Sequence, residues 1–231
     1  MTIRVALSLL IVMGLWASCF PLITIGLDLA PHLAFAAMRA VLAGLCLIAT
    51  AVLLRRPLPR GGRIWALLLL VGLGSTSLGF LGMFHAAEFV SPGLATVIAN
   101  TQPLLAAILA HVVLGEKLTA RGEIGLIIGF IGIIGMGSAG LVSGAIRGYA
   151  LGIAYISLAA VGVAVGNVTI KHLSDEIDAT MAMGLQLLLG AAPLALLSAL
   201  TEDFSSVAWS GEFVIILVTL SVFGKIGRAH V

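Results

Sequence analysis

One permanent positive charge, Arg39, stands in the first half of an apolar stretch of the chain, residues 33–54. Ionisable side chains are costly inside a membrane-spanning segment and are candidates for function by default. A guanidinium holds a carboxylate through two parallel hydrogen bonds, so Arg39 indicates binding of an anionic substrate group or an ion pair between helices. The alternative is that its long side chain extends to the lipid headgroups. We include Arg39 among the predicted substrate-binding residues.

Polar residues also interrupt the middle of another apolar stretch, where Asn100 and Gln102 stand just before Pro103. The proline removes one helical hydrogen bond and frees a carbonyl about one turn earlier. Polar side chains beside a broken turn at mid-membrane depth suit a substrate site. Hydrogen bonding between helices is the alternative use of the two amides. Trp16 either offers its ring face to a substrate or fills space. These four residues join Arg39 as predicted substrate-binding residues.

Three titratable residues near the ends of apolar stretches are candidates for gating or for coupling to a proton. His85 and Glu88 are three positions apart and share one face of a helix, and histidine titrates near neutral pH. Ordinary polar residues at a membrane interface are the alternative interpretation of this pair. Glu116 lies in a turn between two apolar stretches, where it caps the next helix or contributes to gating.

The elements that must position these residues are apolar stretches, each near the length needed to cross a bilayer. A helix of about 20 apolar residues covers a hydrocarbon core of about 30 Å. Hydrophobic residues make up 61% of the chain and charged residues 10%, and the mean hydropathy is +1.21. Backbone groups in lipid must be paired within their own segment, so the stretches must be helices. Seven stretches reach this length: residues 5–26, 33–54, 64–86, 92–114, 122–142, 148–170 and 179–200. An eighth, residues 211–224, is shorter. The sequence therefore predicts an all-α polytopic membrane protein with the lipid bilayer as its surroundings.

Basic residues between the stretches follow an alternating pattern. Arg147 is the only basic residue in one set of connections, whereas the other set and the amino-terminal segment hold eight: Arg4, Arg55, Arg56, Arg60, Arg63, Lys117, Arg121 and Lys171. By the positive-inside rule, the amino terminus and the basic connections are cytoplasmic. We expect the cell membrane, the inner membrane of a prokaryote, as the location. The net charge is +2, and the basic residues that produce it are spread along the chain, where they mark the topology. They do not indicate a nucleic-acid partner.

Internal repetition is weak in identity but regular in period. Aligning the chain with itself so that Arg39 falls on Gln186 also places Trp16 on Val163 and Leu47 on Leu194. The period spans five stretches, an odd number, so the second copy would enter the membrane from the opposite side. Inverted repeats of this kind are the usual construction of secondary transporters, with the substrate site between the halves.

The motifs along the first repeat resemble the EamA branch of the drug/metabolite transporter superfamily. The shared pattern is a proline in the fourth span, a Leu-Gly-Glu-x-Leu-Thr turn and a glycine-rich fifth span. The matching residues in this chain are Gly14–Ser18, Met38-Arg39, Phe84–Pro92, Asn100–Leu105, Leu114–Thr119 and the glycines at 125, 129, 132 and 135.

The resemblance implies ten helices built as two inverted five-helix repeats, both termini in the cytoplasm, and transport of a small metabolite or drug by alternating access. It covers residues 1–142 as one whole EamA-like repeat and residues 148–224 as part of a second. The chain would then hold seven membrane helices and a truncated eighth. We interpret residues 225–231 as a non-native tail, because IGRAHV looks like the translation of a sequencing adapter.

Enzyme motifs are missing from the sequence. It contains no His-Glu-x-x-His, no G-x-S-x-G and no phosphate-binding loop, and no cysteine–histidine set has the spacing of metal ligands. We therefore expect no catalytic residues, no metal and no cofactor. A small-molecule metabolite or drug is the expected partner, with a coupling proton as a further one. A non-transporting or channel-like membrane subunit is the alternative function, and the oligomeric state is left open, with a homodimer as one option.

Overall fold

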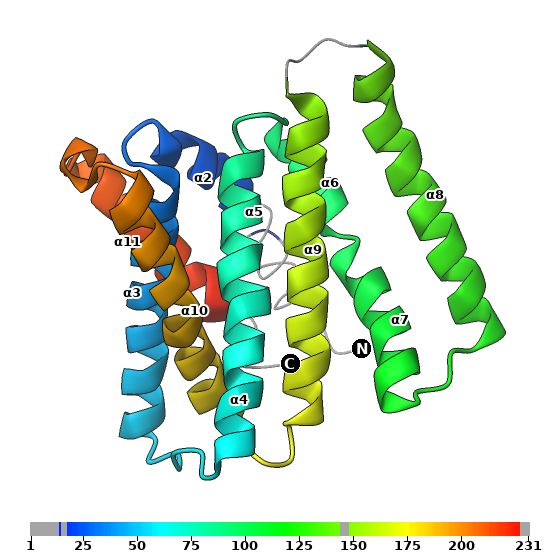
Figure 1. Ribbon diagram of the computed structural model, residues 1–231, viewed down its shortest axis with the longest axis horizontal. Helices are drawn as coiled ribbons and strands as arrows, with labels where there is room; N and C mark the ends of the chain where they lie inside the picture. The colour runs from blue at the N-terminus through cyan, green and yellow to red at the C-terminus, as the bar shows by residue number, and fades with distance from the viewer. Residues whose placement is uncertain (1–13, 15–17, 144–147, 227–231) are drawn as a thin grey trace.

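The computed structural model describes residue 14, residues 18–143 and residues 148–226, without the side chains of residues 137–143 and 223–226. Trp16, one of the predicted substrate-binding residues, lies outside the described residues. Every regular element in the described ranges is a helix (Figure 1). The elements are α2 (Cys19–Leu27), α3 (His32–Leu53), α4 (Gly62–Val71), η1 (Gly72–Leu78), α5 (Gly79–Ala86), α6 (Pro92–Ala99), α7 (Gln102–Leu114), α8 (Ala120–Ser143), α9 (Tyr149–His172), α10 (Ala179–Thr201), η2 (Phe204–Ser206) and α11 (Gly211–Ile226).

Five of the described helical segments are long and apolar enough to cross a membrane: His32–Leu53, Gly62–Ala86, Pro92–Leu114, Tyr149–His172 and Ala179–Thr201. They coincide with the second, third, fourth, sixth and seventh predicted stretches, and α8 covers the fifth. The helical class and the multi-pass membrane architecture are therefore confirmed. The number of seven spans and the inverted repeat remain predictions.

The long helices lie side by side and their connections gather at two ends of the bundle (Figure 1). Following the predicted orientation, we call the end at the N-terminus of α3 the outer end. The basic connections after α3, α7 and α9 lie at the opposite end, which we call the inner end. At the outer end, the backbone N–H of Ala208 donates a hydrogen bond of 2.8 Å to the carbonyl of Leu29, which ties the segment before α11 to the turn after α2.

Helices α3 and α10 are antiparallel and make the most extensive contact in the bundle. Small residues allow it: a Cβ at Gly44 would lie 3.1 Å from the carbonyl oxygen of Gly184 and 2.8 Å from the side chain of Leu188. Close backbone approach through glycine is a common way to associate helices in lipid, where dispersion contacts take the place of a hydrophobic driving force. The pair joins the first predicted repeat to the second.

Between α4 and α5 the same helix continues through η1, a π-helical segment rich in small residues. The segment packs against both α9 and α10. A Cβ at Gly72 would lie 2.7 Å from the carbonyl oxygen of Gln186, and one at Gly74 would lie 2.6 Å from that of Gly162. Segments of π-helix inside α-helices often mark functional sites.

The segment Pro92–Leu114, the fourth predicted stretch, breaks at Asn100 and Thr101, between α6 and α7. Pro103 occupies the first turn of α7, where its missing N–H costs least. The carbonyl of Ile98 accepts two hydrogen bonds from Thr101 at the break, one of 2.9 Å from its backbone N–H and one of 2.7 Å from its hydroxyl. The break that the sequence predicts at the proline is therefore present.

Candidate functional site

Arg39 lies in the interior of the bundle with only 3% of its surface exposed. Its Nη2 donates to the sulfur of Cys19 on α2 at 3.9 Å, and its Cζ lies 4.7 Å from the centre of the Phe80 ring on α5. Nη1 has no hydrogen-bond partner among the described residues. The side chain thus packs inside the bundle and does not extend to the headgroups.

The surroundings of Arg39 are apolar and aromatic. Phe35 packs edge-on against Phe84 at 5.1 Å between ring centres, and Phe213 on α11 lies 5.3 Å from Phe35. On α11, the hydroxyl of Ser221 donates to the backbone carbonyl of Arg39 at 3.3 Å. In such a low-dielectric setting a charge interacts strongly with any anion that reaches it. The geometry therefore suits capture of an anionic group.

A second buried polar residue, Gln186 on α10, was not selected by the sequence analysis. It is fully buried, and its Oε1 accepts a hydrogen bond of 2.8 Å from the hydroxyl of Thr76 in η1. Its Nε2 has no partner among the described residues. A signal for it existed, because the repeat alignment places Gln186 opposite Arg39 and the residue stands in an apolar stretch.

The three predicted residues around the break in the fourth segment lie elsewhere in the bundle. Their helices pack mainly against α9, whereas Arg39 contacts α2, α5 and α11. Asn100 is exposed and its amide donates to the carbonyl of Thr96 within its own helix at 2.8 Å. Pro103 is exposed and Gln102 is half-buried. The structure does not bring Asn100, Gln102 and Pro103 together with Arg39.

At the outer end, Glu88 pairs with a residue that the sequence analysis had not considered. Its Oε1 lies 2.7 Å from Nε2 of His32, the first residue of α3, an ion pair whenever the histidine is protonated. His85 stacks on His32 at 5.1 Å and on Tyr155 of α9 at 5.2 Å, and its Nδ1 lies 2.9 Å from the carbonyl oxygen of Leu81. The predicted pair of His85 and Glu88 therefore forms part of a larger cluster in which each residue has its own partner.

A second carboxylate links two helices at this end of the bundle. Glu202, at the end of α10, accepts hydrogen bonds of 2.8 Å from the backbone N–H groups of both Leu33 and Ala34, and one of 2.9 Å from the hydroxyl of Ser198. A carboxylate at a helix N-terminus satisfies unpaired donors and complements the helix dipole. The first turn of α3 is thus capped by the other half of the bundle.

At the inner end, Glu116 forms an ion pair of 2.6 Å with Lys171, which joins the turn after α7 to the end of α9. The alternative in which Glu116 caps the next helix is not what the structure shows. The hydroxyl of Thr119 accepts the hydrogen bond from the N–H of Gly122 there, at 3.2 Å. Threonine is a common N-capping residue, and Glu116 is left to bridge two connections.

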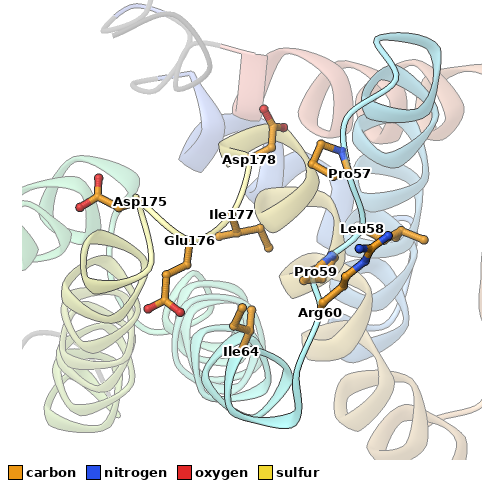
Figure 2. A pocket seen from close by; sticks show the side chains of 9 residues that line it. All are labelled: Pro57, Leu58, Pro59, Arg60, Ile64, Asp175, Glu176, Ile177 and Asp178. Carbon is orange, nitrogen blue, oxygen red and sulfur yellow. The ribbon is translucent and has the colours of Figure 1, made fainter.

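A cavity of about 470 Å³ opens at the same end between the connections after α3 and after α9. Figure 2 shows the first connection along one side and the second, with its carboxylates, along the other. Arg56 of the first connection forms an ion pair with Asp178 at 3.4 Å, and Arg63, in the first turn of α4, forms one with Glu176 at 2.9 Å. The lining residues are Pro57, Leu58, Pro59, Arg60, Ile64, Asp175, Glu176, Ile177 and Asp178.

Within the described ranges, no three histidine, cysteine or acidic side chains are grouped in a way that could hold a metal ion. Apart from Nε2 of His32, which faces Glu88, the buried side-chain nitrogens that lack a hydrogen-bond partner among the described residues belong to Arg39 and Gln186. Both are hydrogen-bond donors, so they fit a ligand that supplies acceptors.

Comparison with known proteins identifies the family of this chain. Residues 3–138 match the model of the EamA-like transporter family. The chain is 30% identical over 225 residues to the uncharacterized transporter YvbV of Bacillus subtilis (strain 168), a match that covers 95% of this chain and 71% of the relative. It is 33% identical over 199 residues to the chloroplastic WAT1-related protein At3g02690 of Arabidopsis thaliana, which covers 82% of this chain and 47% of the relative.

A solved crystal structure has a similar fold, with a TM-score of 0.61 at 23% sequence identity. The match covers 93% of this chain and 72% of the other. At this identity the likeness concerns the fold alone.

Proposed function

Because the chain belongs to the EamA-like transporter family, we propose that it acts as a secondary transporter, which moves a small anionic metabolite or drug across the cell membrane by alternating access. The family supports the transport of a solute. The anionic character of that solute is inferred from Arg39, whose charge is buried among apolar side chains while one of its nitrogens has no partner in the described part of the chain. A buried guanidinium is best compensated by an anion, and a substrate carboxylate would supply one.

Two sets of contacts, one at each end of the bundle, are suited to open in turn. The outer set joins His32 to Glu88 and Glu202 to the first turn of α3. The inner set consists of the ion pairs made by Arg56, Arg63 and Lys171, which lie at partly exposed positions. Exposed ion pairs are individually weak, about 1 kcal/mol or less, so they can break and re-form during a transport cycle.

A coupling proton fits the outer set. Histidine changes charge in the physiological pH range, and the contact between His32 and Glu88 is an ion pair only when the histidine is protonated. Binding or release of one proton there would change the strength of the outer contacts. We therefore propose that His32 takes part in coupling together with His85 and Glu88, and that Glu116 with Lys171 belongs to the inner gate.

Counterflow in proteoliposomes tests the proposed function. The purified protein is reconstituted, the vesicles are loaded with unlabelled small carboxylic acids, and uptake of a trace of the same labelled acid is followed. A carrier exchanges labelled for unlabelled substrate, so transient accumulation above equilibrium is expected for at least one acid and for none of the matched primary amines. A channel-like protein would give equilibration without accumulation, and that result, or accumulation of amines alone, would contradict the proposal.

A further inference from the structure

We infer that Gln186 is a second substrate-binding residue, and that the substrate carries a hydrogen-bond acceptor besides the anionic group held by Arg39. This inference rests on the proposed function and narrows its substrate class to small acids with two acceptor groups, such as dicarboxylates. Neither the family nor the comparisons assign a role to Gln186.

The first argument is the unused hydrogen-bonding capacity of a fully buried amide. Thr76 occupies one end of the amide, since its hydroxyl donates to Oε1 at 2.8 Å, and Nε2 at the other end has no partner within the ranges that the structure describes. Leaving a buried donor unpaired is unfavourable, and native interiors contain few such groups. An apolar residue of the same size would remove that cost, so the amide is better explained by a ligand that pairs with it.

The second argument is that the side chains contacting Gln186 and Arg39 lie on one helix. Thr76, which anchors Gln186, and Phe80, which covers the guanidinium of Arg39, are four positions apart on the helix formed by η1 and α5. Residues four apart lie on the same helix face, about one turn or roughly 6 Å from each other. A short dicarboxylate is about as long as one helical turn, so this spacing of Thr76 and Phe80 favours a ligand with one carboxylate on Arg39 and the other on the amide of Gln186.

The third argument is that the packing around Gln186 can separate without breaking large side-chain contacts. The backbone of α10 at Gln186 lies against Gly72, and the neighbouring Gly190 lies against Gly72 and Thr76. The hydroxyl of Ser77 donates to the carbonyl of Gly190 at 2.7 Å. Helices that meet through glycine and small hydroxyl residues present smooth surfaces to each other, and π-helical segments can rewind locally. Opening of this contact would admit a ligand to both donors.

Binding to the purified chain in detergent tests the inference with two probes of equal length: glutarate, which has two carboxylates, and pentanoate, which has one. Affinity is measured from the shift of the thermal unfolding midpoint across a concentration series. The unmodified protein is expected to bind glutarate about tenfold more tightly than pentanoate. Gln186→Met, which keeps the length of the side chain and removes the donor, should bring the affinity for glutarate to that for pentanoate and leave pentanoate unaffected.

Thr76→Val is the second variant, because it removes the hydrogen bond that orients the amide and conserves shape. It should weaken glutarate binding in the same direction, so the test stands even where Gln186→Met fails to fold. Thr50→Val is the matched control, since Thr50 is exposed on α3 and bonds only the carbonyl of Cys46 in its own helix at 2.8 Å. It should behave like the unmodified protein.

Three results would overturn the inference: equal affinity of the unmodified protein for the two acids, no binding of either acid, or a preference for glutarate that survives in Gln186→Met and Thr76→Val. Binding is measured without transport, so the outcome is separable from that of counterflow. If the preference for glutarate depends on Gln186 but the protein gives no counterflow, the binding site is supported and the proposed transport function is refuted. If acids show counterflow that does not depend on Gln186, transport is supported and the role of Gln186 is refuted.

Discussion

Glu202 and Leu33 are separated by most of the chain, yet the carboxylate of the first accepts a hydrogen bond from the backbone N–H of the second at 2.8 Å. Glu202 ends α10 and Leu33 begins the first turn of α3, so the most extensive helix pair of the bundle is fastened at its outer end. At the inner end, Arg56 after α3 pairs with Asp178, the N-cap of α10, at 3.4 Å. The two helices are thus joined at both ends and held by glycine contacts between them.

Removing the cap on α3 should destabilise the protein. Glu202→Ala leaves the N–H groups of Leu33 and Ala34 without their acceptor, and loss of a helix cap costs about 1 kcal/mol. We expect a lower unfolding temperature in detergent, measured by tryptophan fluorescence. Asp175→Ala, at an exposed carboxylate in the connection after α9, is the control and should leave the unfolding temperature unchanged. Equal effects of the two substitutions would contradict the capping role.

Adding one methyl group at Gly190 should disrupt the contact between α10 and η1. A Cβ there would meet the carbonyl oxygen of Gly72 and the Cβ of Thr76, neither of which can move without shifting a helix. Overpacking of this kind costs about 1–3 kcal/mol. Gly125→Ala on α8 is the matched control, since nothing lies within 4 Å of its added Cβ. The control should be neutral or slightly stabilising in the same thermal unfolding assay, because alanine favours helix over glycine.

Arg39→Lys should fold and insert but lose most of its transport. Lysine keeps the charge and loses the planar fork that holds a carboxylate by two hydrogen bonds and stacks over the Phe80 ring. Counterflow of the acid carried by the unmodified protein is expected to fall by about tenfold or more, because the free energy of one strong charged hydrogen bond corresponds to a change of that size in affinity. Arg60→Lys, in the exposed connection after α3, should keep full activity. An Arg39→Lys protein with normal counterflow would remove Arg39 from the substrate site.

Cysteine labelling should place the two ends of the bundle on opposite sides of the membrane. In a background in which Cys19 and Cys46 are replaced by alanine, single cysteines at positions 60 and 206 are introduced, at the inner and outer ends respectively. A membrane-impermeant maleimide added to intact cells should label position 206 alone, and lysis should expose position 60. Labelling of both positions from outside would refute the orientation derived from the basic connections.

Local properties of the chain determined the helical architecture. The lengths and apolarity of the stretches placed the described spans, because a backbone in lipid must pair its own polar groups whatever its neighbours are. Pro103 located the break between α6 and α7, since a missing N–H acts within one turn. The same reasoning identified Arg39 as a buried charge, because few explanations exist for a guanidinium inside an apolar helix.

The partners of these groups were decided only by the tertiary structure. Sequence reasoning paired His85 with Glu88 by helical spacing, whereas helix packing brings His32 to Glu88. It predicted Asn100, Gln102 and Arg39 as substrate-binding residues together, whereas the helices on either side of Asn100 pack mainly against α9, away from Arg39. Gln186 became a candidate only through its burial against Thr76 and through a nitrogen that pairs with none of the described residues. Spacing fixes which face of one helix a side chain occupies, but the neighbour opposite that face depends on how the helices of both halves pack.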